Sequence, residues 1–333
     1  MRAVIGGRCW VLVLRAVVVL ATGACAVVLS ASAAARPHAV VHDERATYAV
    51  GMRSYVFVDR SRPTSSNGSY PGAQTRTLPT LLLYPAVGNP SGPAVMDATP
   101  IRREHGFPII VFSHGFGASG PAYSFLLQRF VQEGYVIAAP TFPLSSGGAP
   151  GGAKLSDYVN QPGDVSFVLT SVLGLARQDR SLRRTIDRHD VGVFGHSLGA
   201  ITTLGVATNS CCVDPRIKAA VSFSGIELPF PGGSFFSTPT PPLMLVHGDA
   251  DQTVPYVASV NAYAQAPAPK AFLTLEHAPH VPFLAPWLDP AVRSITDFLD
   301  GFLKHDRRAL RRLATDGNVP GVASIQEDLP RLR

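Results

Sequence analysis

The segment VGVFGHSLG, residues 191–199, joins a short apolar run to the small-residue segment 200–207. The first part has the composition of a buried strand and segment 200–207 that of a helix. Between them lies the pattern G-x-S-x-G, centred on Ser197. Glycines on both sides of a serine allow a sharp strand-to-helix turn, which exposes the hydroxyl at the carboxyl end of the strand. We therefore predict an exposed, reactive Ser197, the alternative being an ordinary glycine-flanked helix cap.

The residues around this segment alternate between short apolar runs and longer helical patterns. Runs such as 109–112 and 243–246 show no polar alternation, which is typical of strands buried on both faces of a parallel sheet. The expected fold class is therefore α/β, a doubly wound, mostly parallel sheet. An antiparallel hairpin, Tyr48–Asp59 with Leu78–Ala86, is expected at its N-terminal edge. The other expected strands are Ile109–Ser113, Tyr135–Ala139, Val191–Gly195, Ala219–Ser224, Leu243–His247 and Phe272–Leu275, and the expected helices are Tyr123–Glu133, Val165–Arg177, Ala200–Ala207 and Ala291–Lys304.

The N-terminus has the pattern of an export signal. Three arginines precede an apolar run at 16–29, and Ala31-Ser32-Ala33 fits the small-residue rule for cleavage. A membrane-spanning helix needs about 20 apolar residues, so a permanent anchor is the less favoured alternative. Lipid attachment through Cys25 is a weaker one. We predict a signal peptide at 1–33, a linker at 34–46, a catalytic domain at 47–313 and a C-terminal tail at 314–333, in a secreted or extracytoplasmic protein.

The composition excludes an intrinsically disordered protein and disfavours a nucleic-acid-binding one. With 46% hydrophobic and 16% charged residues, the 333-residue chain must bury a large core. Removing the predicted signal takes away three arginines, so the net charge falls from +6 to +3. The remaining cationic cluster, Arg307 to Arg312, lacks interleaved aromatics and indicates a solvated helix end rather than a nucleic-acid or lipid site. We expect a monomer without nucleic-acid partner, stable membrane span, metal or other cofactor.

Two short motifs have a functional and a plainer interpretation. Cys211 and Cys212 are adjacent, so a bridge between them would close almost no loop, and we interpret them as structural or as a local redox feature. Asn67-Gly68-Ser69 fits a glycosylation acceptor, but Asn-Gly is first a turn dipeptide, and we prefer the turn.

A serine hydroxyl needs a general base, and the base needs a carboxylate that fixes its tautomer. In this type of fold the expected order is Ser, acid, His. Two carboxylates follow strand 243–247, and we choose Asp251, which lies further from the strand end, over Asp249 as a local turn cap. Among the histidines beyond it we choose His280, in the stiff loop Ala278-Pro279-His280-Val281-Pro282, over His277 and over the third candidate at 305.

A reaction at an ester carbonyl also needs amide donors for the oxyanion. We predict the amide of Leu198, which follows the nucleophile, and that of Phe116 in the glycine-rich segment 114–117. A phosphate-binding loop is the alternative here. The segment matches neither G-x-G-x-x-G nor the P-loop pattern, so we prefer the oxyanion hole.

On these residues, the chain from about Tyr48 to Lys304 resembles α/β-hydrolases of the secreted actinobacterial type, and is similar to platelet-activating-factor acetylhydrolase-like and cutinase-like (polyester hydrolase) lipases. GHSLG at 195–199, SHGFG at 113–117, DQTVP at 251–255 and the loop around His280 carry the resemblance. It implies the α/β-hydrolase fold and ester hydrolysis through an acyl-enzyme, with Ser197 as nucleophile, His280 as base and Asp251 as its orienting acid. Many polyester-degrading members have Met at the position of Leu198 and a C-terminal cysteine pair. This chain has neither, so polymer hydrolysis is not expected.

The expected substrates are small-molecule or lipid esters with short to medium acyl groups. The aromatic loop 228–242 either forms an apolar acyl pocket or packs in the core, and the glycine-rich stretch 145–154 is interpreted as a mobile rim too short for a lid. A cell-envelope acyltransferase with the same three residues is the alternative function. A non-catalytic binding protein on the same scaffold is a weaker one.

Overall fold

The computed structural model describes residues 47–330. The predicted signal peptide and linker lie outside these residues, so both stay predictions. The elements in chain order are β1 (Ala49–Asp59), β2 (Arg76–Ala86), β3 (Val95–Met96), β4 (Phe107–Ser113), η1 (Pro121–Tyr123), α1 (Ser124–Gln132), β5 (Val136–Pro140), η2 (Leu155–Asn160), α2 (Gln161–Gln178), β6 (Ile186–His196), α3 (Leu198–Thr208), β7 (Ile217–Phe223), β8 (Leu243–Gly248), α4 (Tyr256–Gln265), β9 (Lys270–Leu275), α5 (Leu288–Leu303), α6 (Arg307–Asp316) and β10 (Ala323–Asp328).

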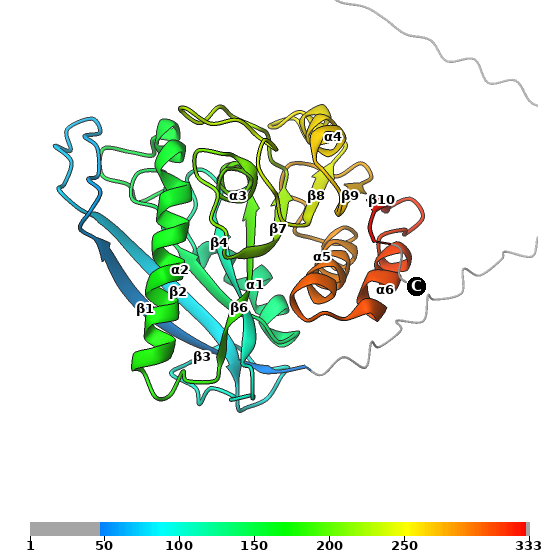
Figure 1. Cartoon of the computed structure of the whole chain (residues 1–333), viewed down its shortest axis with the longest axis horizontal. Helices are drawn as coiled ribbons and strands as arrows, with labels where there is room; N and C mark the ends of the chain where they lie inside the picture. Colours follow the sequence, from blue (N-terminus) through cyan, green and yellow to red (C-terminus); the bar gives the residue numbers. More distant parts are fainter. Residues whose placement is uncertain (1–46, 331–333) are drawn as a thin grey trace, which may run out of the picture. The chain divides into compact units, whose positions relative to one another are not determined.

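All the strands belong to one 10-stranded sheet, in the order β10-β9-β8-β7-β6-β4-β5-β2-β1-β3. The strands from β5 through β4, β6, β7 and β8 to β9 run parallel to their neighbours. β1 and β2 form an antiparallel hairpin, and β2 pairs antiparallel with β5. Helices cover both faces of the sheet (Figure 1). The predicted doubly wound sheet with an antiparallel N-terminal hairpin is confirmed.

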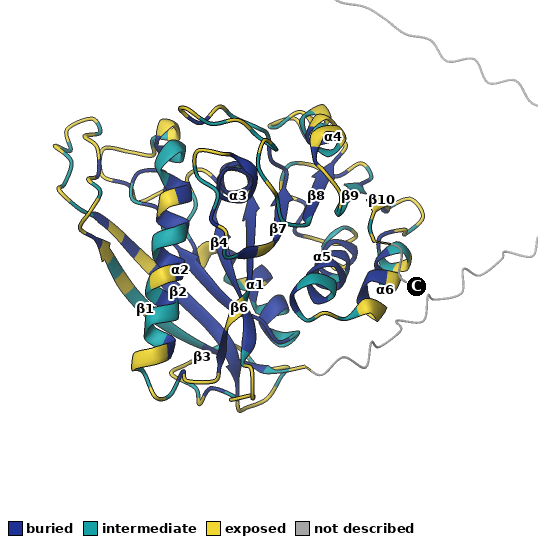
Figure 2. Ribbon diagram, viewed as in Figure 1, coloured by how far each residue is buried: buried dark blue, intermediate teal, exposed yellow. Residues whose placement is uncertain are grey.

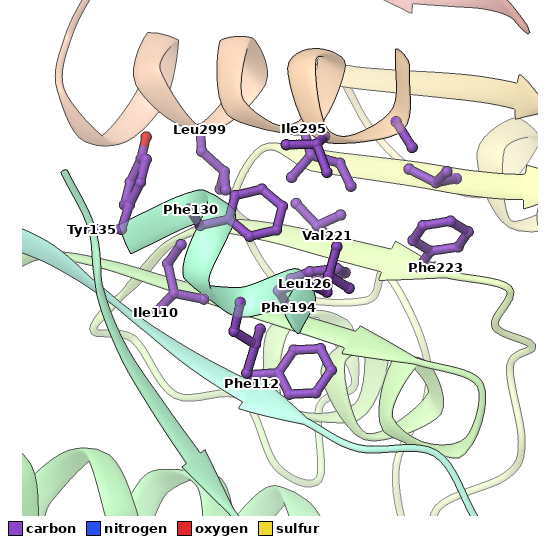
Figure 3. Close-up of a cluster of buried hydrophobic side chains, with 14 of the residues drawn as sticks. Ile110, Phe112, Leu126, Phe130, Tyr135, Phe194, Val221, Phe223, Ile295 and Leu299 are labelled. Atoms are coloured by element: carbon purple, nitrogen blue, oxygen red, sulfur yellow. The ribbon is translucent and has the colours of Figure 1, made fainter. Parts of the chain in front are cut away.

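Two apolar layers hold the helices on the sheet. Alternate residues of β4 point to opposite faces: Ile110 and Phe112 pack with α1 and α5, whereas Ile109 and Val111 pack with α2 and α3. Figure 3 shows the first layer, where Ile295 on α5 faces the sheet. Because both faces are buried, residues 107–112 of β4 are all apolar, and this explains the uninterrupted apolar run in the sequence.

Helix α3 is enclosed on all sides. Each of its residues, Leu198 to Thr208, is buried (Figure 2). A surface helix shows a polar stripe, but a helix surrounded by protein is apolar or small all round. The small-residue segment that follows Ser197 therefore places the serine at the top of a rigid, central helix.

Two strands were not predicted. β3 contains only Val95 and Met96, both exposed, and pairs with β1 at the sheet edge. β10 lies within the predicted C-terminal tail and pairs antiparallel with β9. Its sequence, ASIQED, is largely polar and exposed, since an edge strand needs no apolar run. The tail region thus completes α6 and extends the sheet.

The loop between β1 and β2 is tied to the glycine-rich rim. The Asn67 side-chain amide donates hydrogen bonds to the carbonyls of Pro150 (2.8 Å) and Gly152 (2.6 Å). Gly68 follows with φ of 54°, in a turn closed by backbone hydrogen bonds between Asn67 and Tyr70. The preferred turn interpretation of Asn-Gly agrees with this geometry. The same bonds attach the rim 145–154 to the hairpin.

Candidate active site

Ser197 lies at the junction of β6 and α3. Its backbone angles, φ 57° and ψ −121°, are rare for a residue with a side chain. The turn is possible because Gly195 and Gly199 flank it: a Cβ on Gly195 would collide with the Gly199 carbonyl, and one on Gly199 with the Ser113 carbonyl. The Ser197 amide donates to the Phe223 carbonyl of β7 (2.9 Å), which fixes the turn to the sheet. The hydroxyl therefore stands at the carboxyl end of the strands in a fixed position.

His280 connects this hydroxyl to Asp251. His280 Nε2 lies 2.8 Å from Ser197 Oγ, and Nδ1 lies 2.6 Å from Asp251 Oδ2. A carboxylate can only accept, so Nδ1 carries the proton and Nε2 presents a lone pair to the serine hydroxyl. The His280 side chain is 15% exposed and the Asp251 side chain is fully buried. The structure thus joins the three predicted residues in one chain of hydrogen bonds.

The Asp251 carboxylate is held from four sides. Oδ1 accepts from the amides of Thr253 (2.7 Å) and Val254 (2.9 Å), while Oδ2 accepts from His280 and from His247 Nε2 (3.1 Å). Burial alone would raise the pKa of Asp251, but the hydrogen bonds from His280 and from the two amides outweigh it and hold the pKa below its usual value. Asp251 is therefore a fixed anion.

The two rejected alternatives contact each other instead. Asp249 Oδ1 accepts a hydrogen bond from the His277 amide (2.6 Å). His277 has a φ of 57° and is exposed, so it occupies a turn at the end of β9. This bond caps the turn at the end of β9, 28 residues further along the chain, and local capping by Asp249 of its own turn stays a prediction.

The loop that carries Phe116 is fixed on both sides of it. The Gly115 amide donates to the Tyr123 hydroxyl (3.3 Å), and the Gly117 amide donates to the Ser145 carbonyl (2.8 Å). The Phe116 side chain is about half exposed, at 48%. Leu198 begins α3, whose N-terminal amides favour negative charge nearby. These are the positions chosen for the two oxyanion donors, and that role stays a prediction.

Three further histidines surround the site, and each is buried. His114 Nδ1 donates to the Gly115 carbonyl (2.8 Å), and its Nε2 accepts from the Phe142 amide (3.0 Å). His196 and His247 likewise contact partners through both ring nitrogens. Burial lowers the pKa of His114 and of His196 to about 4, so both are neutral at pH 7. Sequence reasoning assigned no role to these residues or to Tyr123.

The aromatic loop 228–242 contributes to packing. Phe230 is buried against Leu198 and Ile201, and Tyr158 and Phe235 pack around them. This supports the core-packing alternative for Phe230. The same cluster includes Cys212, and the structure joins it to Cys211 in a disulfide.

A cavity of about 410 Å³ borders the loop that follows Phe116. It is lined by hydroxyl-bearing and apolar side chains from the loop, the β1–β2 hairpin and the end of β5, among them Tyr70, Thr75, Ser119, Thr141 and Phe142. No residue in this lining is charged. The cavity is thus suited to a neutral molecule or group.

Between residues 47 and 330, no group of three or more His, Cys, Asp or Glu side chains is arranged to hold a metal ion. In the same range, no helix has the length and apolar character that crossing a membrane requires.

Known proteins resemble the chain in sequence and fold. A family model described as Chlorophyllase matches residues 85–245. Platelet-activating factor acetylhydrolase from Canis lupus familiaris is 25% identical over 183 residues, which are 43% of this chain and 40% of that protein. The chain thus spans less than half the length of this relative.

A solved structure shares the fold. Ferulic acid esterase from Streptomyces cinnamoneus superposes with a TM-score of 0.57 at 20% identity, over 78% of this chain and 91% of the esterase. This shared fold and the sequence similarities agree with the predicted resemblance. The chain has the α/β-hydrolase fold, and its sequence similarities are to an acetylhydrolase and to the Chlorophyllase family model.

Proposed function

We propose that the chain hydrolyses carboxylic esters through an acyl-enzyme formed on Ser197. The observation that carries this proposal is the continuous contact from Ser197 Oγ through His280 to Asp251, at 2.8 Å and 2.6 Å. A neutral imidazole held by a buried carboxylate is the arrangement that removes a proton from a serine hydroxyl. The two ring nitrogens have different partners, so the base is already in its working tautomer.

In the first half-reaction, Ser197 Oγ attacks the ester carbonyl carbon while its proton passes to His280 Nε2. The carbonyl oxygen becomes an oxyanion, which the amides of Phe116 and Leu198 would stabilise. The intermediate then expels the alcohol, which takes the proton from His280, and leaves the acyl group on Ser197. Water repeats the sequence: it loses a proton to His280, attacks the acyl carbonyl, and releases the acid as Ser197 regains its proton.

We propose neutral esters with short to medium acyl groups as substrates. The aromatic Phe116, which is 48% exposed next to a predicted oxyanion donor, offers an apolar surface for such a group. Two similar proteins, an acetylhydrolase and a ferulic acid esterase, support esters of small acids. We also propose that the chain is exported, with cleavage after residue 33, which N-terminal mass analysis of the protein from the medium tests.

The test of the function is turnover of p-nitrophenyl esters from two to twelve acyl carbons. Ser197→Ala should lower kcat by roughly 10⁶-fold, because the nucleophile is lost, while the melting temperature stays within a few degrees. A phosphonate ester should label the wild-type protein once, on Ser197. If Ser197→Ala keeps most of the turnover, or the phosphonate reacts elsewhere, the proposal is wrong. Adding an acceptor alcohol and analysing the products separates hydrolysis from acyl transfer.

A further inference from the structure

His196 occupies the position before the proposed nucleophile and is buried beneath the site. His196 is the last residue of β6. Its ring packs against the rings of Phe223, Phe283 and His280, at centroid distances of 5.8, 4.8 and 5.1 Å. Only 2% of His196 is exposed. It therefore cannot touch a substrate, and any effect on the reaction has to act through its neighbours.

The hydrogen bonds of His196 have one consistent assignment. Its Nε2 lies 2.9 Å from the backbone carbonyl of His280, and its Nδ1 lies 2.8 Å from the Tyr123 hydroxyl. A carbonyl only accepts, so Nε2 carries the proton and donates to it. Burial keeps the pKa of His196 at about 4 and raises that of Tyr123 to about 12, so both side chains are neutral at pH 7. Nδ1 then accepts from the tyrosine hydroxyl.

The same hydroxyl reaches the loop on the other side of the nucleophile. The Tyr123 oxygen accepts a hydrogen bond from the Gly115 amide (3.3 Å), directly before Phe116. The approach is close, because a Cβ on Gly115 would lie 3.0 Å from the Tyr123 oxygen and 3.4 Å from His196 Nδ1, so a side chain there would press on this hydroxyl. The Gly115 amide, the Tyr123 hydroxyl, the His196 imidazole and the His280 carbonyl thus form one directed chain of donors and acceptors.

We propose that Tyr123 and His196 are positioning residues, which together fix the loop of the oxyanion donor and the loop of the base relative to Ser197. This inference rests on the proposed function and deepens it. His280 can accept the serine proton only while its backbone holds the ring 2.8 Å from Ser197 Oγ. The Phe116 amide can meet the oxyanion only while Gly115 is held. Displacing a reacting group by about 1 Å can cost on the order of 10²-fold in rate.

The experiment compares Tyr123→Phe, His196→Phe and His196→Gln with a matched control, Tyr135→Phe. Tyr135 is also buried in this layer, and its hydroxyl donates to Asp300 (2.5 Å). It lies at the opposite end of the layer from Phe223 (Figure 3). Removing its hydroxyl therefore reports the loss of a buried hydrogen bond far from the site.

We expect kcat for p-nitrophenyl butyrate to fall about tenfold in Tyr123→Phe and about 100-fold in His196→Phe, with KM within about threefold. His196→Gln should lie between His196→Phe and wild type, because its amide nitrogen can still donate to the His280 carbonyl. The double variant Tyr123→Phe/His196→Phe should be no slower than His196→Phe alone, since both changes break the same chain. The rate of phosphonate labelling of Ser197 should fall in parallel, while Tyr135→Phe lowers the melting temperature and leaves kcat unchanged.

The outcomes are distinguishable. The Tyr123 and His196 variants are to be assayed at a temperature below their melting temperatures. The positioning role is wrong if their melting temperatures fall but their kcat values equal that of Tyr135→Phe. It is also wrong if the two losses multiply in the double variant. If the wild-type protein turns over no ester and phosphonate leaves Ser197 unlabelled, the proposed function itself fails and this inference with it.

Discussion

The protein buries aspartates in two regions and stabilises them by different means. At the junction of β2, η2 and α2, the fully buried Arg76 guanidinium contacts Asp157 and Asp164, each through two nitrogen–oxygen pairs between 2.6 and 3.2 Å. Arg62 joins the group by donating to Asp164 (2.8 Å) and to Asp59 (2.7 Å). Here each anion faces a permanent cation.

At the candidate active site, the buried Asp251 contacts no lysine or arginine in the part of the chain that the structure describes. Its donors are two backbone amides and two imidazoles. This carboxylate therefore keeps charge that no permanent cation cancels. The charge is available to stabilise His280 when His280 takes the serine proton.

The difference separates a structural role from a catalytic one. In the Arg–Asp cluster every carboxylate is bound by a guanidinium, and the side chains of Arg76, Asp157 and Asp164 are closed to solvent, so the cluster can fix geometry but reaches no substrate. Asp251 instead binds His280, a partly exposed imidazole that contacts the Ser197 hydroxyl, so this group can take part in proton transfer. Removing a charge should therefore cost stability in the first region and rate in the second.

The largest effect is expected from Asp251→Asn. The asparagine can donate to His280 Nδ1 and thereby favour the wrong tautomer, so kcat should fall about 10⁴-fold while the melting temperature changes little. Asp249→Asn is the matched control two residues away and should keep kcat within about threefold, because Asp249 caps a turn. Equal losses in both variants would show that the acid was wrongly chosen.

Arg76→Met should have the opposite profile. It leaves Asp157 without its guanidinium partner and Asp164 with Arg62 alone, which is expected to cost about 3 to 5 kcal/mol of unfolding free energy. The kcat of the folded fraction should stay near that of wild type. Urea unfolding measures the loss, and Arg129→Met is the control. Arg129 and its partner Asp289 are 41% and 63% exposed, so this change should cost at most about 1 kcal/mol. If Arg76→Met lowers the unfolding free energy by only as much as the control, the Arg–Asp cluster does not have the structural role proposed here.

Acid should destabilise the fold through buried histidines such as His114. His114 has a folded pKa of about 4 against 6.5 for a free imidazole, because burial penalises its charge. Between these values the unfolded chain binds a proton that the folded chain does not, so this contribution is complete above pH 6.5 and is lost as the pH falls to 4. The loss is up to about 3 kcal/mol for such a histidine.

Urea unfolding between pH 7 and pH 4 measures this slope. His114→Gln should flatten it by about one proton. An unchanged slope in His114→Gln would mean that this imidazole is already protonated in the folded chain.

Most strands of the sheet, and the order Ser, Asp, His of the candidate site residues along the chain, can be predicted from the sequence because both follow from local patterns. Apolar runs mark strands buried on both faces, and their carboxyl ends locate Ser197, Asp251 and His280. The contact between Tyr123 and His196 cannot be predicted from such local patterns. They are 73 residues apart and meet only through the packing of α1 on the sheet, and the second position of G-x-S-x-G places no demand on its side chain. β10 escaped for a related reason, since a polar edge strand is defined by its neighbour β9.

The smallest effect tests how Asp251 is held. His247→Phe keeps a ring beside Tyr256 but removes one of the four donors to the carboxylate, so kcat should fall about five- to tenfold, the equivalent of one hydrogen bond of about 1 kcal/mol. His247→Gln retains a donor nitrogen and should lose less. If both variants match wild type, the amides and His280 alone suffice to hold the anion, and the active-site carboxylate is as firmly fixed by neutral donors as Asp157 is by Arg76.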